Sequence, residues 1–129
     1  MDQVRQPAVA GSFYPANATI LSGEVSRLLD AARSRAEIAA DSPKVLIVPH
    51  AGYIYSGSIA ALAYDQLSAV RDSVRRVVLL GPVHRVPVRG LALAGASAFA
   101  TPLGEIELDA DATRLLAGLP QVVVSAAAH

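Results

Sequence analysis

Two of the three histidines follow short apolar runs, and their imidazoles are the first candidates for chemistry. His50 comes directly after residues 44–49, and His84 lies four residues beyond the end of residues 76–80. If the two runs are neighbouring parallel strands, they lie about 4.8 Å apart and both imidazoles leave the same edge of a sheet, where ligands bind. Two such imidazoles can bind one metal ion at about 2.0–2.1 Å. The alternative is that each histidine ends a loop and hydrogen-bonds to the backbone.

The segment after His50 has the glycine spacing of a loop that binds an anion. Gly52 and Gly57 stand five positions apart, between an apolar run and a helical pattern. A P-loop requires lysine after its second glycine, but position 58 is serine, which argues against nucleotide hydrolysis. Ser56 is a candidate cap for the helix, whose N-terminus could hold an anion or a substrate carboxylate.

Tyr53 and Tyr55 lie in the same segment, where a phenol could serve as a hydrogen-bond partner or an acid. A half-buried packing role is the alternative, and it is favoured for Tyr55. We therefore take His50, His84 and Tyr53 as the candidate catalytic residues, with the two histidines as metal ligands. The other acidic groups are weaker candidates: Glu105 and Glu107 alternate on an expected solvent-facing strand, and Asp109 and Asp111 have the positions of helix-start residues.

The elements that would position these residues are those of an α/β protein. Apolar runs at 44–49 and 76–80 flank a helical pattern at 57–69, which predicts a right-handed βαβ unit with both strands buried on two faces. The first eighteen residues predict an irregular lead-in, with Phe13 and Tyr14 packed onto the body. Further expected elements are a helix at 19–36 capped by Asn17 or Thr19, strands at 91–95 and 105–108 separated by a turn at 101–104, a helix at 109–118 capped by Asp109, and a strand at 121–124. The expected core is Leu46, Ile47, Val48, Val77, Val78, Leu79 and Leu80.

Composition limits the function classes. The 129 residues fit one globular domain, and the absence of cysteine excludes thiol nucleophiles and zinc ribbons. Eleven basic residues balance eleven acidic ones, so no electrostatic surface favours nucleic acid or an anionic membrane. The first residues lack signal-peptide features, which predicts a cytoplasmic location. The apolar strand at 121–125 leaves an open edge, so we expect self-association or cover by further polypeptide.

Four successive segments resemble the signatures of the Memo family, also called AmmeMemoRadiSam system protein B. They are Pro7-Ala8-Val9-Ala10-Gly11-Ser12-Phe13-Tyr14-Pro15, Pro49-His50-Ala51-Gly52-Tyr53-Ile54-Tyr55-Ser56-Gly57, Gly81-Pro82-Val83-His84 and Thr101-Pro102-Leu103-Gly104. The second is long and specific, and the order and spacing of all four match. By this resemblance, residues 1–129 are the N-terminal part of a domain about twice as long.

The resemblance implies a three-layer α/β fold with a mostly parallel sheet and flanking helices, similar to the class III extradiol dioxygenases. By that likeness His50 and His84 correspond to two metal-site histidines, and a further histidine and a cysteine lie in the half of the domain beyond this chain. Non-heme Fe²⁺ is the favoured metal, with Cu²⁺ or Zn²⁺ as alternatives. The implied function is a dioxygenase-like, metal-dependent oxidoreductase acting on a small molecule. The alternative is a non-catalytic scaffold protein that binds an anionic ligand or phosphopeptide in the same cleft.

Overall fold

The computed structural model describes residues 3–35 and 42–129. The chain divides into two compact units, one formed by Ala8–Arg75 and the other by Met1–Pro7 with Arg76–His129. Each unit has its own helices and core, and each is described by itself. Within the described ranges, no helix is long and apolar enough to cross a lipid bilayer.

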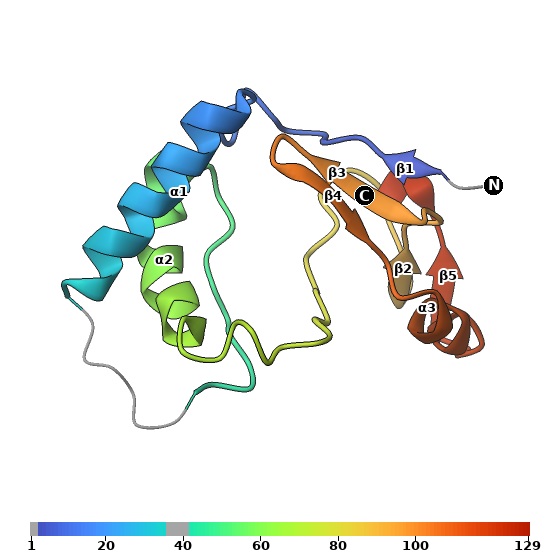
Figure 1. The fold of residues 1–129 in the computed structure, drawn as a ribbon. Coiled ribbons are helices and arrows are strands. Elements are labelled where there is room, and N and C mark those ends of the chain that lie inside the picture. Colours follow the sequence, from blue (N-terminus) through green and yellow to red (C-terminus); the bar gives the residue numbers. More distant parts are fainter. Residues whose placement is uncertain (1–2, 36–41) are drawn as a thin grey trace. The chain divides into compact units, whose positions relative to one another are not determined.

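The Ala8–Arg75 unit is a helix pair. Helix α1 (Ala18–Arg33) begins where the Asn17 side chain accepts a hydrogen bond of 3.1 Å from the Ile20 backbone N–H, as the cap prediction required. The second helical segment comprises a π-helical turn η1 (Tyr53–Gly57), helix α2 (Ser58–Tyr64) and a 3₁₀ turn η2 (Asp65–Leu67). Helices α1 and α2 pack side by side (Figure 1). Leu21, Ala32 and Ala61 are buried in this unit.

The helix predictions are confirmed in type and approximate position. The expected helix 19–36 corresponds to α1, although Ala36 lies outside the described residues. The expected helix 57–69 begins earlier, at Tyr53, and ends in the 3₁₀ turn. The amphipathic pattern identifies a helix correctly because it is a local property, whereas the ends depend on contacts elsewhere in the unit.

The second unit contains two small sheets. Strand β1 (Val4–Arg5) pairs in parallel with β3 (Ala98–Thr101), which pairs antiparallel with β4 (Gly104–Glu107). Strand β2 (Leu91–Leu93) pairs in parallel with β5 (Val122–Val124). Helix α3 (Ala110–Ala117) packs against β5, and a 3₁₀ turn η3 (Ala126–Ala128) follows (Figure 1). The protein is therefore a mixed α/β protein, as predicted.

The turn predicted at 101–104 is a tight hairpin between β3 and β4. The Thr101 hydroxyl donates to the Gly104 carbonyl oxygen at 2.9 Å and accepts from the Leu103 N–H at 3.1 Å. Gly104 has a φ of 130°, a region that residues with a Cβ rarely adopt. The hairpin joins β3 to β4, so the strand before the turn is 98–101, which the sequence did not indicate.

The two apolar runs at 44–49 and 76–80 are not strands, and the predicted βαβ unit and buried core are wrong. No residue of either run forms part of a strand. Ile47 is 94 % exposed, and Val77, Val78, Leu79 and Leu80 are 74–79 % exposed. Leu46 and Val48 are only partly covered. An all-apolar strand needs hydrogen-bonded neighbours and cover on both faces, and the described part of the chain supplies neither to these runs.

Candidate functional site

The segment containing His50 is held against the lead-in of the chain. The Tyr53 backbone N–H donates a hydrogen bond of 2.8 Å to the carbonyl oxygen of Phe13. Gly52 lies close to the same residue, since a Cβ added to it would stand 3.4 Å from the Phe13 oxygen. Residues 8–15 and 49–57, which belong to two of the segments that carried the family resemblance, thus meet within one unit. The sequence did not indicate this contact.

Ser56 has a different role from the one predicted for it. Its hydroxyl donates a hydrogen bond of 2.9 Å to the carbonyl oxygen of Ala51, and only 7 % of the residue is exposed. The helical geometry begins at Tyr53, so Ser56 lies within the first turn and does not precede it. Gly57 occupies the N-cap position of α2, without a side-chain cap. The predicted capping role is therefore wrong.

At the helix N-terminus expected to hold an anion, three backbone N–H groups are bonded within the chain. The backbone N–H groups of Tyr55 and Ser56 donate to the Gly52 carbonyl oxygen at 2.9 and 3.1 Å, and that of Tyr53 donates to Phe13. An anion at a helix N-terminus requires N–H groups that are not already bonded. The geometry argues against a phosphate or carboxylate at this position.

The Tyr53 phenol is a half-buried group beside two other tyrosines. Its ring centroid lies 5.8 Å from that of Tyr14, with the planes inclined at 45°. Burial, and then the nearby Tyr14 and Tyr64, raise the pKa of Tyr53 above its usual value of about 10. Tyr53 is thus a protonated hydrogen-bond donor at neutral pH. Tyr55, expected to be half-buried, is 78 % exposed, so the packing role predicted for it is wrong.

His50 and His84 belong to different units. His50 is an exposed residue of the Ala8–Arg75 unit, two positions before Gly52, and His84 is an exposed residue of the other unit, after Gly81-Pro82-Val83. Within residues 3–35 and 42–129, no group of three or more His, Cys, Asp or Glu side chains could hold a metal ion. A catalytic zinc site uses three protein ligands. The described residues therefore do not complete a metal site by themselves.

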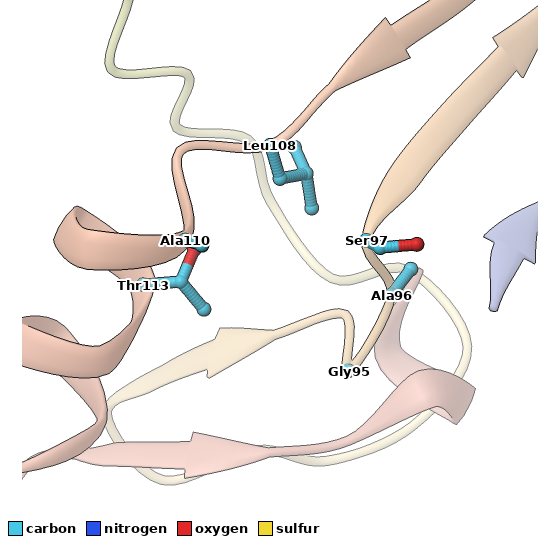
Figure 2. A pocket seen from close by; sticks show the side chains of 6 residues that line it. All are labelled: Gly95, Ala96, Ser97, Leu108, Ala110 and Thr113. Atoms are coloured by element: carbon cyan, nitrogen blue, oxygen red, sulfur yellow. The ribbon is translucent and has the colours of Figure 1, made fainter. Parts of the chain in front are cut away.

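A pocket of about 240 Å³ lies in the second unit, beside the start of α3 (Figure 2). Its walls are small or apolar residues: Gly95, Ala96, Ser97, Leu108, Ala110 and Thr113. No acidic, basic or imidazole side chain lines it, so it has no acid–base or metal-binding group. No chemistry-bearing residue in the sequence pointed to it.

Asp109, next to this pocket, is the N-cap of α3, as the sequence predicted. Its carboxylate accepts from the Ala112 N–H at 2.9 Å at the start of α3 and from Arg76 Nε at 2.7 Å. These hydrogen bonds, with the Ala112 N–H first, lower the pKa of Asp109 below its usual value. Glu105 and Glu107 are exposed on β4, as expected.

Known proteins match this chain over most of its length. The family model described as Memo-like protein matches residues 5–127. The memo-1 homolog of Caenorhabditis elegans is 40 % identical over 108 residues, which are 84 % of this chain and 29 % of that protein. A MEMO1 family protein of Aquifex aeolicus is 37 % identical, over 84 % of this chain and 38 % of its own length. Protein MEMO1 of Danio rerio is 38 % identical, over 81 % of this chain and 33 % of its own length.

The chain therefore belongs to the Memo-like protein family. It spans about a third of the length of the curated relatives that it matches.

Proposed function

We propose that His50 and His84 are two ligands of a transition-metal site in a Memo-like, metal-dependent oxidoreductase. The metal is Fe²⁺, with Cu²⁺ or Zn²⁺ as alternatives. The remaining ligands come from outside the described residues, because these contain no cluster of three or more suitable side chains. His50 and His84 would hold the ion, and an iron ion there would supply oxidation by O₂.

The observation that carries the proposal is the hydrogen-bonded backbone directly after His50. The Ala51–Gly52 peptide group, one residue after His50, is held by the Ser56 hydroxyl through the Ala51 carbonyl oxygen, and the Tyr53 N–H is bonded to the Phe13 carbonyl oxygen. π-helical turns such as η1 occur frequently at functional sites. A metal ligand needs such support, because its ring must be oriented before the ion binds.

The alternative, a scaffold protein that recognises an anionic ligand or phosphopeptide, has weaker support. Its expected binding position was the helix N-terminus after Gly52, and the N–H groups of Tyr53, Tyr55 and Ser56 are bonded within the chain. Metal binding through imidazole nitrogens does not depend on those donors. We therefore favour the metal site over the anion site.

Calorimetric titration tests the proposal. The wild-type chain, His50→Ala and His84→Ala are titrated with Zn²⁺, which is redox-inactive, and with Fe²⁺ under anaerobic conditions. We expect weak binding by the wild type, since two imidazoles alone do not make a tight site, and loss of binding in both variants. His129→Ala is the control, because His129 Nε2 lies 3.0 Å from the Ala92 carbonyl oxygen in a structural contact. Wild-type binding by both variants would contradict the metal site and leave the scaffold function as the better account.

A further inference from the structure

We propose that Ser56 is a positioning residue for the His50 imidazole and acts through the Ala51 carbonyl group. This inference rests on the metal site proposed above, and it adds a residue to that site. Ser56 is chosen because it is a buried polar residue whose side chain bonds to the backbone immediately after the candidate ligand.

The geometry places two constraints on the short stretch that follows His50. The Ser56 hydroxyl donates to the Ala51 carbonyl oxygen at 2.9 Å, and the Tyr53 N–H donates to the Phe13 carbonyl oxygen at 2.8 Å. Only Gly52 separates the two constrained residues, and its backbone lies against Phe13. The backbone of residues 51–53, directly after His50, is thus bonded both to the helix and to the lead-in.

Loss of the Ser56 hydroxyl removes one of these constraints and leaves His50 itself unsubstituted. The Ala51–Gly52 peptide group then loses this restraint, so the backbone of Ala51, which is bonded directly to His50, is held less firmly. Groups that orient a metal ligand typically contribute 10- to 100-fold to metal affinity. Because Ser56 acts through one peptide group, we expect the lower end, about a 10-fold weakening.

The test compares Ser56→Ala with a matched serine in the same unit. Ser34 makes the same kind of bond, from its hydroxyl to the Ala31 carbonyl oxygen at 2.8 Å, at the end of α1. The wild type, Ser56→Ala, Ser34→Ala and Ser56→Thr are titrated with Zn²⁺ by calorimetry and with Co²⁺ by visible absorption. The Co²⁺ spectrum reports the arrangement of ligands around the ion, which a general loss of stability does not alter.

We expect Ser56→Ala to bind about 10-fold more weakly with a changed Co²⁺ spectrum, and Ser34→Ala to match the wild type. Ser56→Thr keeps the hydroxyl and should restore the wild-type spectrum. If Ser56→Ala does not fold, the test depends on Ser56→Thr. A folded Ser56→Thr variant that binds Zn²⁺ more weakly than the wild type overturns the inference.

The experiment distinguishes failure of the role proposed for Ser56 from failure of the proposed metal site. If the wild type binds in a His50-dependent way but Ser56→Ala binds equally well with an unchanged spectrum, only the role of Ser56 is wrong. If the wild type shows no His50-dependent binding, the metal site and the role of Ser56 are both overturned.

Discussion

Arg33, the last residue of α1, forms an ion pair with Asp65, the first residue of the 3₁₀ turn after α2. Arg33 Nη2 lies 3.1 Å from Asp65 Oδ1, and the Ser68 hydroxyl donates to the same oxygen at 2.8 Å. Only 8 % of Asp65 is exposed, so its carboxylate depends on these donors. This pair joins the two helices that form the unit containing His50 and Tyr53.

Removal of the arginine should destabilise this helix pair. In Arg33→Ala the buried Asp65 carboxylate loses its arginine partner and keeps the Ser68 hydroxyl donor, so the free energy of unfolding should fall by about 1–2 kcal/mol. Urea denaturation measures the change. The control is Arg71→Ala, because Arg71 pairs with Asp72 at 3.6 Å and both side chains are exposed. That variant should stay within about 0.5 kcal/mol of the wild type, and equal losses in the two variants would contradict the role of the Arg33–Asp65 pair.

Gly90 should tolerate no side chain. It has a φ of 82°, and a Cβ there would collide with the Gln121 carbonyl oxygen, which accepts the Leu91 N–H at 2.9 Å beside the β2–β5 pair. Gly90→Ala should therefore cost at least about 2 kcal/mol in urea denaturation. Gly23→Ala is the matched change: this glycine lies within α1 with open space around it, so alanine there should stabilise by about 0.5–1 kcal/mol. The two substitutions should have opposite signs.

The stability of the second unit should fall in acid because of Asp109. Hydrogen bonds from the Ala112 N–H and from Arg76 lower the pKa of this carboxyl group in the folded state. A carboxyl group with a lowered folded-state pKa stabilises the fold above its unfolded pKa of about 4, and this contribution is lost as the pH falls through the folded value. Asp109→Asn keeps a capping side chain that does not titrate. The stability difference between wild type and variant should be larger at pH 6 than at pH 3, and a pH-independent difference would contradict the assignment.

The exposed run Val77–Leu80 should cause the chain to self-associate. Four consecutive apolar side chains here are 74–79 % exposed, and exposed apolar segments of β-branched and aliphatic residues favour pairing with other chains. Leu79→Lys should reduce the associated fraction in sedimentation velocity. Leu115→Lys changes a comparably exposed leucine, 77 % exposed, on α3 and should have a smaller effect. A wild-type chain that is monomeric and unfolds cooperatively would contradict this prediction.

The features that could be predicted from the sequence are local ones. The Asn17 and Asp109 caps follow from side chains that reach backbone N–H groups three residues away, and both were identified. The amphipathic repeat in α1 and the hairpin turn at 101–104 are equally short-range. Each can be read from a few consecutive residues.

The strand predictions that were wrong, and the strand pairs that were not predicted, depend on partners far along the chain. An apolar run becomes a strand only if other segments pair with it, and 44–49 and 76–80 have no strand partner among the described residues. Conversely, β1 and β3 carry no strong pattern, yet they pair in a register fixed by the Ser97 N–H bond to the Gln3 carbonyl oxygen at 2.9 Å.

At the candidate site, too, local features could be predicted from the sequence and contacts between distant segments could not. The sequence identified Tyr53 as a chemical group near His50, but its ring contact with Tyr14 and the bond from its N–H to Phe13 join residues that are 39 and 40 positions apart in the chain. The bond from Ser56 back to Ala51 depends on the helix starting at Tyr53, which the apolar pattern did not indicate.

The number of imidazoles bound to the metal tests the central claim most directly. X-ray absorption of the chain loaded with Zn²⁺ counts histidine ligands from the scattering of their rings, at pH 7, where neutral imidazoles bind metals. The account predicts two imidazoles in the wild type, one in His50→Ala and one in His84→Ala where the ion is still held. An unchanged count in both variants, or a Zn²⁺ ion without imidazole ligands in the wild type, would contradict it.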